Sequence, residues 1–339
     1  MAVTLSDVAR EAGVSLATAS RAINGSASRT VGPELRDRVL AVAARLRYTP
    51  DANAQAMARG RTTSLGLLVH NIADPYFSTI AAGVAQSADA ANLQLTLASS
   101  ENDPAREVEM VHLMRRQRAR AIILAGGRSD DVAVNEHLRL ALADFRSSGG
   151  SAALIGQPIL GVNTVVVNNA QGASSLAQAM HDLGYRRFAV LGGPEDYLTA
   201  RERRDGFVFA LRQLGTAVSD DDIIFSPMDH DGGEEGMRAL IARGELPEMI
   251  FAIADTMALG AMAVIREAGI RVPQDVAIAG FNDISTLRDV TPGLTSVRVP
   301  LHAMGHIATE LALAEPGDEP EIHTVHTEVV IRDSTPRLR

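Results

Sequence analysis

The sequence contains no cysteine and no lysine. Without cysteine the chain can form neither a disulfide nor a thiolate metal site, and it has no cysteine nucleophile. This absence fits a reducing compartment. All 32 basic residues are arginine, which we interpret as a composition bias of the genome rather than as a functional feature.

Long apolar runs are also missing. The N-terminus has no basic and apolar leader, and no stretch approaches the roughly 20 apolar residues that a membrane-spanning helix needs. We therefore expect a soluble, cytoplasmic protein without a membrane partner. Its 339 residues are enough for two or three domains with buried cores.

The motifs of the common enzyme classes are absent as well. The sequence has no G-x-G-x-x-G, Walker, G-x-S-x-G or H-E-x-x-H motif, so dinucleotide, phosphoryl-transfer, serine-hydrolase and zinc-protease chemistry lack their usual signatures. His302 and His306 have the spacing of one helix face, but two histidines without a third ligand are typical of surface or packing residues. The same applies to His323 and His326. We predict no enzyme activity, no cofactor and no metal site.

Two short helix patterns separated by a glycine occupy residues 4–25. Thr4 and Asp7 form a Thr-x-x-Asp capping box, and Gly13 stands where a helix would end in a left-handed residue. Ser15 can cap a second helix, whose polar surface indicates a partner. This pattern is typical of a helix-turn-helix, in which the start of the second helix enters a DNA groove. The residues predicted to face the small core are Val8, Ala9, Ala12, Val14, Ala19 and Ile23.

A third helix is predicted to begin at Pro33, because proline is favoured in the first turn of a helix. Leu35, Val39, Val42 and Leu46 follow at spacings of three and four residues. They would supply the third side of the core. The N-terminal residues are therefore predicted to form an all-α head.

Charge is distributed unevenly along the chain. The formal charge is −9, but residues 1–60 carry a net charge of +3 and the remainder carries −12. The positive charge therefore lies where the helix-turn-helix is predicted. Because +3 is small for one phosphate-binding module, two heads acting together are the more credible unit. We expect a homodimer on a two-fold symmetric operator of double-stranded DNA.

The alanine-rich segment 51–60 follows the predicted head, with Asp51 in front and Gly60 at its end. Its length allows only about two helical turns, and helices shorter than about 12 residues seldom hold alone in water. We expect this segment to be ordered only when something binds it. A plain linker with a buried methionine is the alternative.

From Thr63 onward, apolar runs of strand length alternate with helical stretches. Continuous apolar strands between helices indicate parallel sheets covered on both faces, which is a doubly wound α/β fold. We predict two such sheets, with the first crossing near 156–163, a return near 292–300 and a last strand near 324–333. Two lobes joined by crossing strands form a cleft that can close on a small molecule. The first set of strands is predicted at 64–70, 93–99, 121–126 and 152–156, and the second at 164–168, 187–193, 222–225, 249–255 and 276–281.

The head motif VTLSDVAREAGVSLATASRAING, followed by a Tyr48-Thr49-Pro50 corner, resembles the DNA-binding head of the lactose/galactose repressor (LacI) family. The body resembles the same family in the segments Asn71-Ile-Ala-Asp-Pro-Tyr-Phe77 and Arg201-Glu-Arg-Arg-Asp-Gly-Phe207. Further matching motifs lie at 254–260, 280–283 and 294–298.

The resemblance implies an all-α helix-turn-helix head plus an α/β, two-lobed, periplasmic-binding-protein-like body with two doubly wound parallel sheets. It also implies a sequence-specific transcriptional regulator, usually a repressor, that is controlled by a small-molecule effector in the cleft. The implied domains are a head at 1–50, a hinge helix or linker at 51–61, an N-terminal lobe at 62–160 and 293–322, and a C-terminal lobe at 161–292 and 323–339.

Carried over to this chain, the resemblance places DNA contacts in the second helix and in the hinge. Arg21 can fork onto guanine, whereas Leu16 and Ala17 can read only thymine methyls or groove shape. Met57 matches the apolar wedge of the minor groove, and Ala54 matches the close-contact position. The full set of predicted DNA-binding residues is Ser15, Leu16, Ala17, Thr18, Ser20, Arg21, Asn24, Ala54 and Met57.

In the body, the resemblance implies that Phe77 packs on the effector and that Arg203 makes fork-shaped hydrogen bonds to its oxygens. Asn168 and Asn282 replace the usual aspartates, and Asp231 stands where an aromatic residue often stacks on a sugar. These departures favour a polyol, a pentose, a nucleoside or a ligand with an anionic group over a simple hexose, or a pocket that has lost its ligand. The predicted effector-binding residues are Asn71, Tyr76, Phe77, Asn168, Thr199, Arg203, Asp231, Asp255 and Asn282.

A solute-binding protein or a doubly wound enzyme could share the body fold. Residues 1–60 separate these possibilities, because a transport protein would begin with an export signal and would lack a groove-reading helix. The head therefore favours the regulator.

Overall fold

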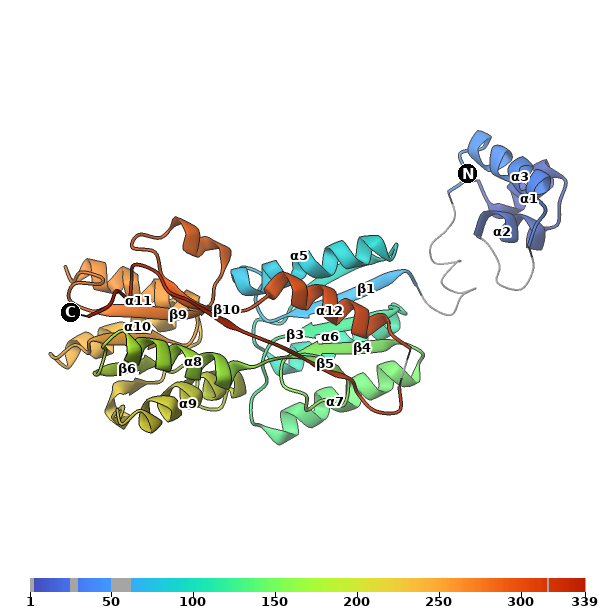
Figure 1. Cartoon of the computed structure of the whole chain (residues 1–339). Coiled ribbons are helices and arrows are strands. Elements are labelled where there is room, and N and C mark those ends of the chain that lie inside the picture. Colours follow the sequence, from blue (N-terminus) through green and yellow to red (C-terminus); the bar gives the residue numbers. More distant parts are fainter. Residues whose placement is uncertain (1–2, 25–29, 50–61, 316, 339) are drawn as a thin grey trace. The chain divides into compact units, whose positions relative to one another are not determined.

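The structure is a computed structural model that describes residues 3–24, 30–49, 62–315 and 317–338 (Figure 1). It divides into two compact units, Met1–Thr63 and Ser64–Arg339, which we call the head and the body. The predicted hinge at 51–61, with Ala54 and Met57, lies outside the described residues.

The described residues of the head form three helices, as the sequence predicts for them. The hydroxyl of Thr4 accepts a hydrogen bond from the backbone N–H of Asp7, whose carboxylate in turn accepts from the N–H of Thr4, so the capping box is confirmed. Gly13 ends the first helix at φ 66°, in the left-handed region. Pro33 begins the third helix, and its N-cap, Gly32, makes no side-chain hydrogen bond. The helices are α1 (Leu5–Ala12), α2 (Leu16–Asn24) and α3 (Pro33–Arg45).

A small apolar core joins these three helices. Val8, Ala19 and Val39 are completely buried, one from each helix. On the outside, the carboxylate of Glu11 accepts a 2.6 Å hydrogen bond from the Arg45 guanidinium and links α1 to α3. The predicted inward faces are confirmed: Val8, Ala9, Ala12, Ala19, Val39 and Val42 are buried, and Val14, Ile23 and Leu46 pack against them partly buried.

The body contains two six-stranded sheets. The first has the order β11-β5-β4-β3-β1-β2 and is parallel throughout. The second has the order β12-β10-β9-β8-β6-β7 and is parallel except where β12 pairs with β10. The strands are β1 (Ser64–Val69), β2 (Gln94–Ser99), β3 (Ala121–Ala125), β4 (Ser151–Ile155), β5 (Asn163–Val167), β6 (Phe188–Leu191), β7 (Ile223–Ile224), β8 (Met249–Ala252), β9 (Ala277–Asn282), β10 (Thr295–Arg298), β11 (Ile322–Val325) and β12 (Glu328–Val330).

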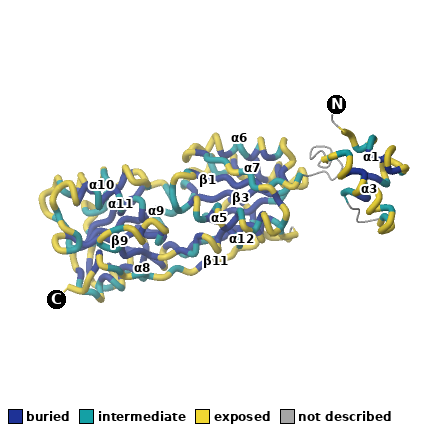
Figure 2. The backbone as a smooth tube through the Cα atoms, turned by 90° about the horizontal axis from the view of Figure 1, so that it is seen from above, coloured by how far each residue is buried: buried dark blue, intermediate teal, exposed yellow. Residues whose placement is uncertain are grey.

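Helices cover both sheets, and the strands between them are buried (Figure 2). Among the described residues, no helix has the length and apolar character that crossing a membrane requires. The helices of the first lobe are α5 (Pro75–Ala90), α6 (Pro104–Arg116), α7 (Val132–Ser147) and α12 (Leu301–Leu313), and those of the second are α8 (Asn169–Asp182), α9 (Leu198–Gln213), α10 (His230–Ala242) and α11 (Asp255–Glu267), with short 3-10 helices η1 (Asp220–Asp222) and η2 (Ser285–Asp289).

The doubly wound architecture and the strands predicted up to residue 281 are confirmed, but the predicted lobe boundaries at 161, 293 and 323 are wrong. The strand predicted at 164–168 belongs to the first sheet and not to the second, and the single last strand predicted near 324–333 is two short strands, β11 in the first sheet and β12 in the second. β5 pairs with β4 in the first sheet, so the chain first crosses after Val167. β10 pairs with β9 in the second sheet, so the return follows Arg298. β11 pairs with β5, which keeps the chain in the first sheet up to Val325. An apolar run identifies a buried strand, whereas long-range pairing decides which sheet contains it.

Close approach of helices fixes the outer layer of the first lobe. A Cβ atom added at Gly83 of α5 would lie 2.1 Å from the carbonyl oxygen of His302 in α12. One added at Gly305 of α12 would lie 2.4 Å from the carbonyl oxygen of Ile80. The two backbones therefore touch, which only glycine permits at these positions.

Gly305→Ala should destabilise the body by about 1–3 kcal/mol, because α5 and α12 must separate to admit the methyl group. Gly293→Ala is the control, since the nearest atoms to its added Cβ would be side-chain atoms of Arg332 and Asp333, at ordinary contact distances between 3.5 and 3.8 Å. Urea unfolding of both variants measures the difference. Equal stability of the two variants would contradict the packing described for α5 and α12.

Candidate functional site

A cavity of about 500 Å³ lies between the two lobes. Several residues that line it come from the loops after the carboxyl ends of parallel strands: His70 comes directly after β1, and Arg128 and Pro194 lie three residues after β3 and β6. This is where ligands bind in open α/β sheets. The position of the cavity therefore follows from the strand directions in both sheets.

Six of the predicted effector-binding residues line this cavity. Phe77 and Tyr76 come from the first turn of α5, and their rings pack edge to face with centroids 4.9 Å apart. Arg203 comes from α9 in the other lobe. The structure thus brings together residues that are distant in the sequence. The six are Asn71, Tyr76, Phe77, Thr199, Arg203 and Asn282.

Arg203 is only 2% exposed and is held in a fixed orientation. Its Nε donates to Oδ1 of Asn169 at 2.9 Å, and its Nη1 donates to the carbonyl oxygen of Ile253 at 2.9 Å. The guanidinium carbon lies 3.9 Å from the ring centroid of Phe281. Burial lowers the pKa of Arg203 to about 10, so the group stays cationic at neutral pH. Nη2 has no hydrogen bond within the described part of the chain and is available to a ligand.

Asn168 and Asp231 are not brought into the cavity, contrary to the prediction. Asn168 is the N-cap of α8, where its backbone N–H donates to the carbonyl oxygen of Val325, and the neighbouring Asn169 contacts Arg203 instead. The side chain of Asp231 is 100% exposed in the first turn of α10. The physical reason is helix phase, because a shift of one or two residues turns a side chain to another face.

Asp255 is also misassigned as a cavity residue. It is completely buried, and its two oxygens accept hydrogen bonds from the Ser296 hydroxyl at 2.6 Å and from the Ile284 N–H at 2.9 Å. Burial raises its pKa to about 6. Asp255 therefore holds the start of α11 against β10 and the segment before η2, and neighbouring Ala254 lines the cavity.

Several acidic residues that line the cavity were not predicted from the sequence as site residues, and in the structure they cap helices. Asp74 accepts from the Tyr76 N–H at 2.9 Å, Asp131 from the Ala133 N–H at 2.8 Å and Asp229 from the Gly232 N–H at 2.7 Å. Asp-Pro at 74–75 is the sequence signal that could have identified the first of them. Burial raises the pKa of Asp74. The cavity thus offers carboxylate acceptors from both lobes.

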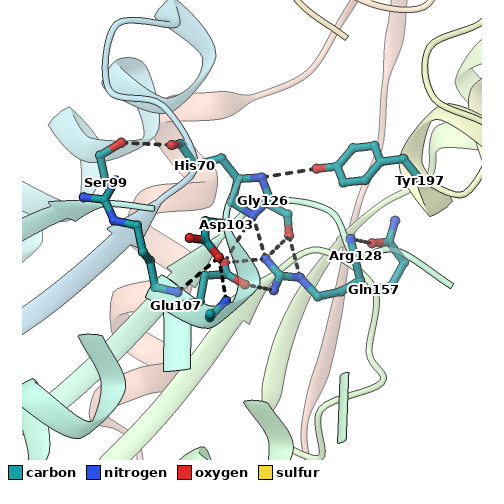
Figure 3. A network of polar contacts seen from close by, with 10 residues as sticks. His70, Ser99, Asp103, Glu107, Gly126, Arg128, Gln157 and Tyr197 are labelled. Atoms are coloured by element: carbon teal, nitrogen blue, oxygen red, sulfur yellow. Dashed lines mark hydrogen bonds and ion pairs between the residues drawn. The ribbon is translucent and has the colours of Figure 1, made fainter. Parts of the chain in front are cut away.

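A buried charged network, shown in Figure 3, forms the wall of the cavity on the first lobe and was also missed. Arg128 donates to Oε2 of Glu107 at 2.6 Å through Nη1, and to Oε1 at 3.0 Å through Nη2. Nη2 also lies 2.9 Å from Nε2 of His70. Burial alone would raise the pKa of Glu107, but the hydrogen bond from His70 and the charge of Arg128 outweigh it and lower the pKa to about 2. Burial lowers the pKa of His70.

In the head, the first turn of α2 presents an exposed surface. Leu16 is 52% exposed, and Ser15 and Ala17 are exposed beside it. The Ser15 hydroxyl accepts from the Thr18 N–H at 3.1 Å and caps the helix. Arg21 donates from Nε to the carbonyl oxygen of Ala17 at 2.9 Å, which keeps its guanidinium along this surface. Thr18, Ser20, Arg21 and Asn24 are partly exposed.

Comparison with known proteins identifies both units. Residues 4–51 match the model of bacterial regulatory proteins of the lacI family, and residues 177–335 match that of a periplasmic binding protein-like domain. The chain is 32% identical over 326 residues to the transcriptional regulator GalS of Salmonella typhimurium, covering 96% of this chain and 93% of the relative. It is 31% identical to the transcriptional regulator GalR of Escherichia coli, covering 99% and 97%.

Solved structures agree with this assignment. The transcriptional regulator CelR–cellobiose complex superposes with a TM-score of 0.70 at 27% identity, covering 98% of this chain and 99% of that chain. A lac repressor dimer bound to operator shares the fold, with a TM-score of 0.83 at 23% identity and coverages of 99% and 100%.

The chain belongs to the lacI family of bacterial regulatory proteins. It is a transcriptional regulator with a helix-turn-helix DNA-binding head and a periplasmic-binding-protein-like body, and its relatives are regulators rather than enzymes.

Glu107→Gln should change how stability depends on pH. Because the pKa of Glu107 is about 2 in the folded protein against an ordinary value of 4.5, the carboxylate stabilises the fold above pH 4.5. This contribution is lost as the pH falls from 4.5 towards 2. Below pH 4.5 the unfolding free energy of the wild type should therefore fall more steeply than that of the variant, by up to about 1.4 kcal/mol per pH unit.

Urea unfolding between about pH 3.5 and 7 measures this dependence. At neutral pH the variant should be less stable by about 3–5 kcal/mol, because Arg128 becomes a buried charge without a counterion. Glu136→Gln, which removes only the exposed pair with Arg139, is the control. Parallel pH dependences of wild type and Glu107→Gln would show that Glu107 is not held ionised in the fold.

Proposed function

We propose that this regulator is a repressor that binds a palindromic operator as a homodimer and acts in the cytoplasm. We further propose that a small polyhydroxylated effector in the interlobe cavity controls its binding. The exposed first turn of α2, on a head with its own buried core, is the observation that carries this proposal.

The reading surface of the head supports sequence-specific recognition. The side chains of Leu16 and Ala17 contain only carbon and hydrogen and suit thymine methyl groups, whereas Arg21 carries the fork that pairs with guanine. The bond from Arg21 to the Ala17 carbonyl uses only Nε. Both terminal nitrogens are therefore left for a base. Ser15, Thr18, Ser20 and Asn24 flank this surface with polar groups that suit phosphate contacts.

Charge supports the paired heads. Residues 1–60 of each chain carry a net charge of +3, although the whole chain carries −9. Because +3 is a small charge for binding phosphates, two heads on one duplex double the favourable electrostatic contribution. A two-fold dimer then requires a two-fold operator.

The lining of the cavity supports a neutral polyhydroxylated effector rather than an anionic one. Five carboxylates line it against two arginines, and Glu107 neutralises Arg128. The remaining acids accept hydrogen bonds, and Arg203 is the cation left to donate one to a ligand oxygen. A sugar, polyol or nucleoside supplies hydroxyl groups that both donate and accept. The likeness to a CelR–cellobiose complex and to a ribose operon repressor of Haemophilus influenzae, 30% identical over 91% of this chain and 91% of the relative, is consistent with this class.

Arg21→Ala should weaken operator binding by about 1–3 kcal/mol per half-site and relax the preference at one base pair. Fluorescence anisotropy with operator variants, after selection of the operator from genomic fragments, measures both effects. Arg36→Ala, an exposed arginine on α3 outside the reading surface, is the control. An unchanged affinity and base preference would refute the role of Arg21.

Calorimetric titration of the full chain with polyols, pentoses, hexoses, nucleosides and sugar phosphates tests the effector class. We expect a neutral member to bind and a phosphorylated one to bind more weakly. Arg203→Lys should lower that affinity by about tenfold or more, because lysine cannot keep the two structural bonds and also donate to the ligand. Arg212→Lys, exposed at the far end of α9, is the control. Tight binding of sugar phosphates only, or an unaffected Arg203→Lys variant, would contradict this class.

A further inference from the structure

Two backbone segments, one from each lobe, meet across the cleft and pair with each other beside the cavity. Residues 126–131 follow β3 in the first lobe, and residues 194–201 follow β6 and enter α9 in the second. The N–H of Leu198 donates to the carbonyl oxygen of Arg128 at 2.8 Å, and the N–H of Asp130 donates to that of Asp196 at 2.9 Å. Between them, Ser129 and Tyr197 form an isolated antiparallel bridge. We call this pairing the latch.

Side chains reinforce the latch on both sides. The Arg201 guanidinium pairs with the carboxylate of Asp130 across the lobes. Gln157, after β4 in the first lobe, donates from Nε2 to the hydroxyl of Thr199 at 3.0 Å. The latch therefore combines backbone hydrogen bonds, an ion pair and a hydrogen bond from the Gln157 side-chain amide, all between residues of different lobes.

The charged network of His70, Glu107 and Arg128 fixes the first-lobe half of the latch. Both oxygens of Glu107 already accept hydrogen bonds from Arg128. The Arg128 N–H donates to Oε1 of Gln157 at 2.9 Å. The hydrogen-bonding groups of the network are thus largely used within the network and leave few for a ligand, although the network lines the cavity. Its effect is to hold the backbone of Arg128, whose carbonyl oxygen the second lobe binds.

A chain of hydrogen bonds extends this network to the second lobe (Figure 3). Nε2 of His70 lies 2.9 Å from Nη2 of Arg128 and 3.2 Å from Oε1 of Glu107. On the other side of the ring, Nδ1 lies 3.4 Å from the hydroxyl oxygen of Tyr197 in the second lobe. His70 thus connects the charged network of the first lobe to the second lobe.

Gly127 makes the close approach of the two segments possible. A Cβ atom added there would lie 2.2 Å from Oγ1 of Thr199 and 2.8 Å from the ring of Tyr197. Both contacts are on the second lobe. A methyl group at this position would therefore act as a wedge between the lobes at the latch.

We propose that the latch keeps the cleft closed without an effector, and that His70, Glu107 and Arg128 are positioning residues for this closure rather than ligand contacts. In the terms of the proposed function, on which this part rests, an effector binds after the latch opens. The apparent affinity for the effector is then the intrinsic affinity multiplied by the fraction of molecules in which the latch is open.

The interlobe distance tests this directly, because the cysteine-free chain accepts spin labels at chosen sites only. Ser147→Cys on α7 and Gln213→Cys on α9 lie at exposed positions, one in each lobe. Double electron–electron resonance on labelled full chain, diluted into unlabelled chain, gives the distance distribution within one molecule. For the wild type without effector, we expect a distance distribution with a single narrow peak, at a shorter distance than in a variant whose latch is open.

Gly127→Ala should move most of this distribution to longer distances. Glu107→Gln should shift it in the same direction at neutral pH while the circular dichroism spectrum stays folded, because Arg128 loses its anchor. Gly233→Ala is the matched control, since its added Cβ would meet the Met257 backbone at 2.1 Å inside the second lobe. That variant should lose stability without a change in the interlobe distance.

A broad or long distribution in the ligand-free wild type would overturn the latch, as would an unchanged distribution in Gly127→Ala. A shift in Gly127→Ala without one in Glu107→Gln would refute the positioning role of the charged network. The experiment needs neither DNA nor effector. Its failure would therefore leave the proposed regulator function intact, and failure of the operator titration would leave the latch intact.

Discussion

The buried ion pair between Glu107 and Arg128 is the interaction on which the arrangement of the cleft depends. A carboxylate and a guanidinium taken out of water are costly unless each is fully hydrogen-bonded. Here two direct bonds join them, and His70 and a backbone carbonyl satisfy further groups. Such a pair contributes less to stability than to fixing one geometry, and here it fixes the first-lobe backbone at Arg128, whose carbonyl oxygen accepts a hydrogen bond from the second lobe.

The remaining features of the body follow from strand direction. Parallel strands of both sheets end at the cavity, so helix N-termini and their capping aspartates gather there from both lobes. In the proposed function, these groups accept hydrogen bonds from an effector, while Arg203 donates one. An effector that contacts both lobes at once would couple their positions, and we propose this coupling as the physical basis for control of the head.

The sequence predicts local structure well and spatial pairing poorly. The capping box at Thr4, the left-handed Gly13 and the buried strands could be predicted because each depends on neighbouring residues. The lobe boundaries could not, since the local sequence of β5 and β10 does not say which sheet each strand joins. Resemblance to a family pointed to Phe77 and Arg203, which do line the cavity, but it missed by a residue or two at Asn168 and Asp231, where the helix phase decides which side chain enters the cavity. Glu107 and Arg128 have no sequence signal, because their partnership spans α6 and the end of β3.

We propose that the state of the cleft controls DNA binding by the head, and the operator affinity of the full-length Gly127→Ala variant is the measurement that decides it. This substitution lies in the body and leaves every head residue intact. If the state of the cleft governs DNA binding, the dissociation constant for the operator should change by about fivefold or more relative to the wild type, within the usual range of allosteric coupling. Equal operator affinities, in a variant whose lobes are shown to be apart, would contradict the account.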